Sequence, residues 1–180
     1  EAVSDRMFYG DSSIDNISVD SAKSIGIQAF YGCSYIAAIS MASVESIGDT
    51  SGATYTADKA SDLGVFVGCS TLKTVTMPNV TAIGAFAFYG CNSLVGFNGS
   101  GVAELSGVTH VGYGAFVNTS VSKVTLGSNS VTSYIGDTAF SGCTSLKEFV
   151  LKGGLESFGK DTLARCTLLE KLAIRISVKW

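Results

Sequence analysis

Residues 83–97 read Ile83-Gly-Ala-Phe-Ala-Phe-Tyr-Gly-Cys91-Asn-Ser-Leu-Val-Gly-Phe97. The same pattern of apolar residues, glycine and cysteine returns at residues 25–39, 135–149 and 158–172. In all four copies the cysteine lies eight residues after the first apolar residue, and the next two core positions follow three and six residues later. A fixed internal period is typical of a solenoid, in which each unit buries its apolar side against its neighbours.

Weaker copies extend the pattern over nearly the whole chain. Residues 1–20 hold a degenerate copy, and Phe8 lies 22 residues before Phe30, which is one full period. Another copy has Thr119 in place of cysteine, and the last has Leu163 in place of phenylalanine. We therefore predict an α/β solenoid of about six to seven repeats that forms a single domain over residues 1–180.

One repeat indicates how each turn of the solenoid is built. Residues 72–77 alternate as a half-buried strand does, and residues 80–83 form a second short strand. The following Ala-Phe-x-Gly-Cys segment suits a single helical or 3-10 turn with Phe and Cys facing inward. Asp49 and Asp137 follow the Ile-Gly pair, where a carboxylate can cap that turn. Successive strands are expected to stack in parallel, about 4.8 Å apart.

Two segments interrupt the period. Residues 50–62 delay Phe66 by about fourteen residues, which predicts a surface loop grafted into a turn. Residues 98–107 stretch the next phenylalanine spacing to 28, which predicts a second, smaller bulge. Loops on a rigid scaffold often carry recognition, although an insertion without function is equally consistent with the sequence.

The repeat resembles the BspA-like class of leucine-rich repeats, whose unit reads approximately Ile-Gly-x-x-Ala-Phe-x-Gly-Cys-x-x-Leu-x-x-Val-x-Leu-Pro. The resemblance runs from Phe8 to Ile174, and only Pro78 keeps the strand-ending proline. It implies a right-handed superhelix on a secreted or surface-anchored protein that adheres to host proteins or to other cells. It implies no catalytic residues.

Composition limits the function further. The net charge is −3 and the pI is about 5.0, so the chain has no basic field for nucleic acid. No apolar run approaches the roughly 18–20 residues that cross a bilayer. The chain begins at Glu1 without an initiator methionine or signal peptide, and we expect it to be a segment of a longer protein.

The residues that could carry chemistry have simpler explanations. All five cysteines occupy one repeat position and are expected to be small buried hydrophobes, although one bridge between adjacent turns, Cys33–Cys69 or Cys69–Cys91, stays open. His110 is the only histidine and is expected in a solvated connection, so neither a zinc site nor a catalytic triad is predicted. Asp49 and Asp137 lie too many turns apart for a glycosidase pair. We predict no enzyme, no metal and no cofactor.

A ligand would be read by the outward positions of the strands. One predicted column comprises Asn16, Ala38, Thr74, Gly96, Lys123, Glu148 and Lys171, and the other comprises Ser18, Ser40, Thr76, Asn98, Thr125, Val150 and Ala173. The candidate ligand-binding residues are Tyr55, Lys59, Thr74, Thr76, Asn98, Lys123, Thr125, Glu148 and Lys171. Both columns lack the large aromatic anchors of tight interfaces, so an ordinary solvated face is the alternative.

The sequence thus predicts a non-catalytic extracellular or cell-surface module for binding or adhesion. Its partner would be a protein, for example one of a host, or alternatively a glycan. Recognition would use the solenoid face and the insert at residues 50–62. The alternative is a structural spacer within a larger surface protein.

Overall fold

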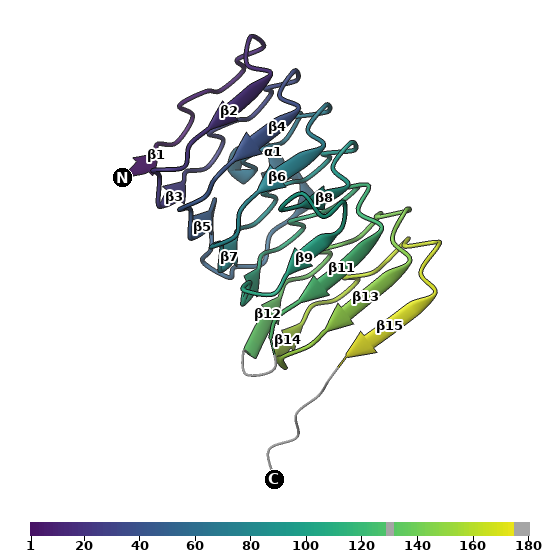
Figure 1. Cartoon of the computed structure of the whole chain (residues 1–180). Coiled ribbons are helices and arrows are strands. Elements are labelled where there is room, and N and C mark those ends of the chain that lie inside the picture. Colours follow the sequence, from purple (N-terminus) through teal and green to yellow (C-terminus); the bar gives the residue numbers. More distant parts are fainter. Residues whose placement is uncertain (129–131, 175–180) are drawn as a thin grey trace.

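The computed structural model describes residues 1–128 and 132–174, which wind into the predicted solenoid (Figure 1). Each of seven turns contributes one short strand to a parallel sheet, here called sheet A. Its strands, in spatial order, are β1 (Ala2–Val3), β3 (Ser24–Ile25), β5 (Ser46–Ile47), β7 (Ala82–Ile83), β10 (His110–Val111), β12 (Thr132–Ile135) and β14 (Gly154–Phe158). The repeat sets the register, because Ile25 faces Ile47 and Ile47 faces Ile83 across the sheet.

A second face of the solenoid is divided into two four-stranded parallel sheets. Sheet B contains β2 (Asn16–Ser18), β4 (Ala38–Ser40), β6 (Thr74–Thr76) and β8 (Gly96–Phe97). Sheet C contains β9 (Ala103–Leu105), β11 (Lys123–Leu126), β13 (Glu148–Leu151) and β15 (Lys171–Ile174). In Figure 1 sheet C is displaced sideways from sheet B.

The core is a ladder of repeated side chains, as the sequence predicts. The six successive phenylalanines of the repeat stack face to face, with ring centroids 4.9–5.3 Å apart: Phe8, Phe30, Phe66, Phe88, Phe116 and Phe140. This spacing follows the distance between neighbouring strands, about 4.8 Å, because every turn adds one ring. A cysteine thiol also links neighbouring turns: the Cys91 Sγ donates to the Phe66 carbonyl of the preceding turn at 3.2 Å.

The segment between the strands is a series of tight turns rather than one helical turn. Within it, the amides of Ala87, Tyr89 and Cys91 each donate to the carbonyl three residues earlier. A 3-10 helix does not propagate, because Phe86 and Gly90 have φ of +54° and +72°. Each residue with positive φ changes the direction of the backbone. Phe88 and Cys91 therefore face inward, as predicted, while the chain returns to the next strand.

The two acidic residues after the Ile-Gly position behave differently: the Asp49 Oδ1 accepts the Ser51 amide of its own turn at 3.0 Å, whereas Asp137 joins neighbouring turns. The Asp137 Oδ1 accepts the backbone amide of Lys160 one turn later at 2.8 Å. Asp5 does the same for Ile27 at 2.9 Å. Neighbouring turns can lie this close because the repeat has glycine at this position: a β-carbon on Gly84 would lie 2.4 Å from the Asp49 carbonyl oxygen. The predicted capping role is therefore wrong for Asp137.

Residues 98–107 do not form a simple bulge. The strand of this turn is split: β8 pairs with β6, a loop follows, and β9 then pairs with β11. The two halves touch directly, because the Phe97 amide donates to the Val102 carbonyl at 3.0 Å. Gly96 is needed there, since a β-carbon on it would lie 2.4 Å from backbone atoms of Gly101 and Val102. The face consequently gains a strand that sheet A lacks.

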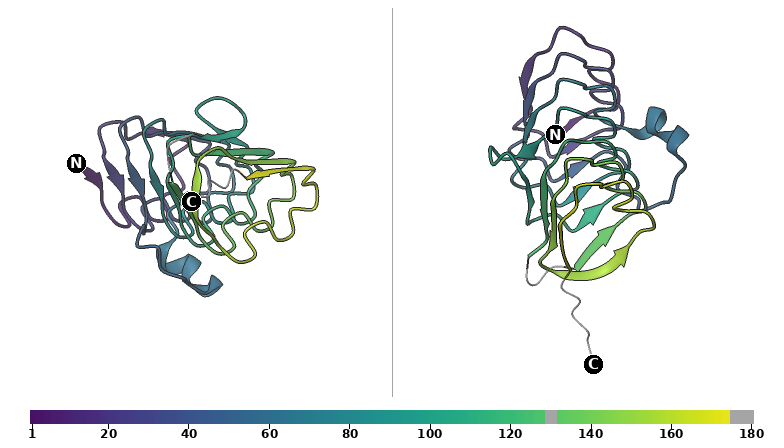
Figure 2. Two further views of the ribbon diagram at one scale, coloured as in Figure 1. Left: turned by 90° about the horizontal axis from the view of Figure 1, so that it is seen from below. Right: turned by 90° about the vertical axis from the view of Figure 1, so that its right-hand side faces the viewer.

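The insert at residues 50–62 leaves the coil as predicted. It contains a 3-10 turn, η1 (Ala57–Lys59), which runs into a single-turn helix, α1 (Ala60–Leu63). Figure 2 shows α1, in blue, standing off the body of the coil on the side away from sheets B and C. The insert and the outer strand face are thus separate surfaces.

Candidate functional site

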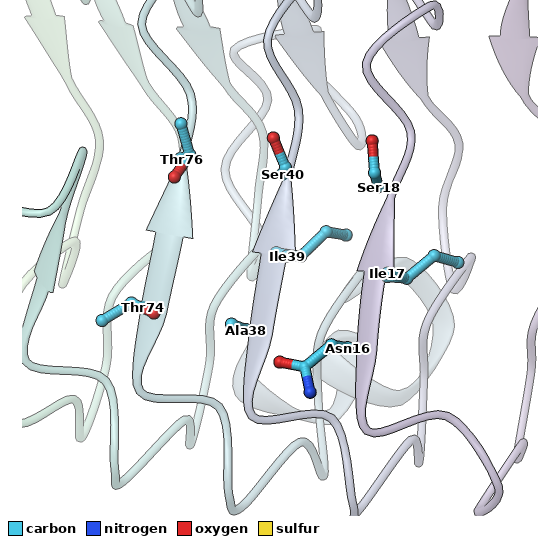
Figure 3. Close-up of a pocket in the computed structure, with 8 residues that line it drawn as sticks. All are labelled: Asn16, Ile17, Ser18, Ala38, Ile39, Ser40, Thr74 and Thr76. Carbon is cyan, nitrogen blue, oxygen red and sulfur yellow. The ribbon is translucent and has the colours of Figure 1, made fainter.

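A shallow hollow on sheet B is the first candidate site. It has a volume of about 370 Å³ and spans three turns (Figure 3). Its lining comprises Asn16, Ile17, Ser18, Ala38, Ile39, Ser40, Thr74 and Thr76. Because strand residues alternate between faces, the small side chains of the two predicted columns come together here and leave the backbone approachable. The hollow can receive a larger side chain of a partner.

An aspartate, Asp20, accepts hydrogen bonds from the serines at one end of the hollow. The hydroxyls of Ser18 and Ser40 donate to the carboxylate of Asp20 at 2.7 and 2.6 Å, and the Ala42 amide donates at 2.7 Å. These hydrogen bonds, that of Ser40 first, hold the pKa of Asp20 below its usual range. The sequence columns did not include Asp20, because it lies just beyond the end of β2.

Sheet C presents a group of charged side chains. Glu148 lies between two lysines, with its Oε1 2.6 Å from Lys171 Nζ and its Oε2 3.5 Å from Lys123 Nζ. The hydrogen bond from Lys171 is the main reason that the pKa of Glu148 is lowered. The three predicted residues are therefore brought together as a ladder across β11, β13 and β15. Such exposed pairs add little to stability, because solvent screens them.

Two of the predicted site residues depart from the predicted columns: Thr125 is buried, and Asn98 is exposed but lies outside the strands. Thr125 is only 2% exposed, and its hydroxyl donates to Glu104 Oε1 at 3.0 Å. Asn98 lies in the loop between β8 and β9, where its Oδ1 accepts the Met77 amide at 2.7 Å. Its predicted place beside Thr125 is taken by Glu104. The columns were drawn through the split strand as though it were continuous, so the predicted pairing of Asn98 with Thr125 is wrong, while a ligand-binding role of either residue stays a prediction.

The insert is anchored by an aromatic cluster. Tyr55 packs on Phe86 and Tyr113, with ring centroids 6.2 and 6.4 Å away. Its hydroxyl donates to the Asp49 carboxylate, and this hydrogen bond is the main reason that the pKa of Tyr55 is raised. Tyr55 is therefore held against the coil. Lys59, by contrast, is exposed and pairs with Asp62 at 3.0 Å within the insert.

The base of the insert rests on His110, which the sequence placed in a solvated connection. His110 instead lies in β10 and stacks on Tyr134 with centroids 4.7 Å apart and planes 8° from parallel. The Tyr134 hydroxyl donates to the Gly52 carbonyl at 3.0 Å. Burial lowers the pKa of His110 more than the nearby Asp49 carboxylate raises it. The expectation of a solvated histidine is wrong, because the insert covers a position that local sequence leaves open.

The cysteines have the environment of packing residues. All five are free thiols, and four of them are fully buried: Cys33, Cys69, Cys91 and Cys143. Burial raises the pKa of Cys143 to about 12 and raises that of Cys69 further. Because the thiolate is the reactive form, these side chains are unreactive at neutral pH. Within residues 1–128 and 132–174, no three His, Cys, Asp or Glu residues are grouped as a metal site.

Comparison with known proteins identifies the repeat. A model of the BspA type leucine rich repeat region matches six copies over residues 1–52 and 62–179. The chain belongs to the BspA-type leucine-rich repeat family. The segment that the family model leaves out, 53–61, lies within the insert, so the insert is an addition to the BspA-type repeat. A comparison with curated protein sequences gave no significant match.

Two solved structures show the same fold. The crystal structure of a leucine-rich repeat protein of T. pallidum, TpLRR, is similar with a TM-score of 0.73 and 26% identity over 93% of this chain and 71% of that one. A leucine-rich repeat protein from Bacteroides ovatus is similar with a TM-score of 0.63 and 26% identity over 87% of this chain and 36% of that one. BspA-type repeats are repeat scaffolds or protein-interaction modules, typically non-catalytic and surface-associated.

Proposed function

We propose that this chain is a binding module that recognises a protein through the strand face, with the hollow of sheet B as its centre. The hollow is the observation that supports the proposal most directly. Six of its side chains are Ala, Ser, Thr or Asn, and they form a concave patch on rigid, hydrogen-bonded strands. A rigid, preformed surface loses little conformational freedom on binding, which favours recognition of an extended partner.

The charged ladder of sheet C lies on the same side of the coil and is proposed to set orientation. Lys171 and Lys123 are 63% and 39% exposed in their side chains, so they remain accessible to an acidic group of a partner. Charges at the edge of an interface contribute to selectivity and association rate more than to affinity. We place the module at the cell surface or outside the cell, as is typical of the family. No described helix is long and apolar enough to cross a bilayer.

The test fills the hollow. Ala38 lies on β4, the middle strand of the hollow, and in Ala38→Arg the guanidinium side chain would occupy the space that the partner needs. Wild type and variant would be compared by biolayer interferometry against purified extracellular-matrix and serum proteins. We expect Ala38→Arg to weaken binding at least about tenfold, or 1.4 kcal/mol.

A matched variant separates the two sides of the coil. Ala53→Arg places the same side chain on the exposed insert, on the other side of the coil, and is expected to bind as wild type does. Loss of binding in Ala53→Arg alone would move the site to the insert and contradict the proposal. If the wild type binds no protein of the panel, the spacer function is favoured, which the lack of large aromatic side chains in the hollow would also suit.

A further inference from the structure

The insert is seated on a histidine whose ring nitrogen has no partner. His110 is the only histidine of the chain. Its Nε2 is shielded from solvent and makes no hydrogen bond within the described residues. A buried neutral acceptor without a partner is tolerable, but a buried N–H⁺ without an acceptor is far more costly. His110 is therefore suited to its place only while it is neutral.

The insert crosses the ring pair formed by His110 and Tyr134. The Gly52 carbonyl accepts the Tyr134 hydroxyl, and a β-carbon placed on Gly52 would lie 3.5 Å from His110 Cε1. The backbone of the insert at Gly52 thus lies beside the Cε1 edge of the imidazole. Release of this backbone is expected to open Nε2 to water.

Among the residues that the structure describes, no group accepts a hydrogen bond from His110 Nε2. On the insert side the charged group is Asp49, whose carboxylate already accepts the Tyr55 hydroxyl and both the amide and the hydroxyl of Ser51. On β12 the titratable neighbour is Tyr134, and on β7 the residue opposite is Ala82. Asp49 favours the protonated ring only at a distance, and burial outweighs it.

We propose that protonation of His110 in mildly acidic solution loosens the insert from the coil, so that residues 50–62 act as an acid-sensitive strap. This inference concerns the insert alone and goes beyond the proposed binding function. The direction follows from linkage: the docked histidine has a pKa below its ordinary value of about 6.5, while a released one regains that value. Docking is therefore complete above about pH 6.5 and weakens as the pH falls through the interval between the two values.

Loosening would uncover an apolar patch. Tyr55 would leave Phe86, which is 1% exposed, together with the half-buried rings of Tyr89 and Tyr113. The rings form a cluster of edge-to-face pairs, with Phe86 5.8 Å from Tyr89 and 5.2 Å from Tyr113. Acid would thus replace a covered surface by an exposed aromatic one.

The first measurement is an NMR titration of the single imidazole. It would compare the wild type with a chain lacking residues 50–63, a deletion that returns Phe66 to the regular spacing of 22 residues after Phe30. We expect the imidazole pKa to be lower in the wild type. Each unit of difference corresponds to about a tenfold loss of the docking equilibrium in acid. Equal pKa values in the two chains would overturn the proposal.

The second measurement is amide hydrogen exchange of residues 53–60 at about pH 7.5 and about pH 5.5, corrected for the intrinsic rate. Protection is expected to fall by the factor that the titration gives. His110→Phe keeps a flat ring against Tyr134 but cannot be protonated, and it is expected to hold its protection at both pH values. An equal acid loss in His110→Phe would assign the release to Asp49 and overturn the proposal. Should that variant not fold, the titration decides alone.

Discussion

The two insertions in this coil have opposite consequences. The first, residues 50–62, begins after Asp49 in a turn and leaves every strand of sheet A paired with its neighbour, Ile47 with Ile83 included. The second, after Phe97, lies within a strand and cuts the outer face into sheets B and C. Each insertion lengthens one turn of the coil, and both turns are built on the same repeat pattern. Only the second changes the surface that the strands present.

The difference comes from where the backbone hydrogen bonds are made. Turn residues bond mostly to their own turn and to one neighbour, so an added loop can leave and return without breaking the ladder. A strand inside a sheet forms backbone hydrogen bonds along both of its edges. When residues are inserted into it, the segment before the insertion pairs with one neighbouring strand and the segment after it pairs with the other. Here β8 supplies one edge and β9 the other. Insertions in strands therefore reshape a solenoid, and insertions in turns decorate it.

The largest expected effect is at the split strand. Phe97 is fully buried and meets Phe88 and Phe116 edge-on at 5.6 and 5.8 Å. Phe97→Ala should lower the free energy of unfolding by about 3–5 kcal/mol because a cavity opens beside the ladder. Urea titration measures this, with Val95→Ala, at a 40% exposed site, as the control expected to change little. A loss below about 1 kcal/mol for Phe97→Ala would show that the split strand is not part of the core.

Gly96→Ala tests whether the contact between β8 and β9 requires a residue without a side chain at position 96. The new β-carbon would lie 2.4 Å from backbone atoms, so the two strands must separate, at a cost of about 1–3 kcal/mol. Thermal unfolding measures the loss. The control is Gly107→Ala in the same connection, where the β-carbon would meet only an ordinary contact at 3.7 Å. Similar losses in both variants would contradict the close contact.

Deleting residues 50–63 should be tolerated, because the turn then regains the regular phenylalanine spacing. We expect a folded coil that is less stable by about 1–2 kcal/mol, since Phe86 loses the cover of Tyr55. Circular dichroism and urea titration would measure it. A deletion that unfolds the chain would show that the insert is part of the coil's core, as the strand at Phe97 is.

Tyr55→Phe should have the smallest effect, and a local one. It removes the donor to Asp49 and leaves the ring on Phe86, for a loss of about 1 kcal/mol in docking of the insert. Hydrogen exchange in the insert should speed up about fivefold, while the melting temperature stays unchanged. Tyr35→Phe, at a 64% exposed position, serves as the control. A lower melting temperature would mean that insert and coil unfold together.

The positions of the candidate site residues could be predicted from the sequence only where the repeat is regular. The residues of the hollow on sheet B, such as Ala38 and Thr74, followed from strand alternation because β2, β4 and β6 keep one register. Thr125 and Asn98 were wrongly predicted to be neighbours, because sequence length alone does not distinguish a strand split by a loop from a strand followed by a bulge. His110 was misplaced because its burial depends on an insert that lies 58 residues earlier at Gly52.

The sequence by itself determined the coil, its parallel strands and its ladder of stacked rings, because a fixed period repeats one local solution in every turn. Which insertion would decorate the coil and which would divide its face was decided only by tertiary pairing. The reason is that strand edges are satisfied between turns, by residues that no local pattern links. The same holds for the covered imidazole of His110, whose surroundings come from three separate segments: β12, β7 and the insert.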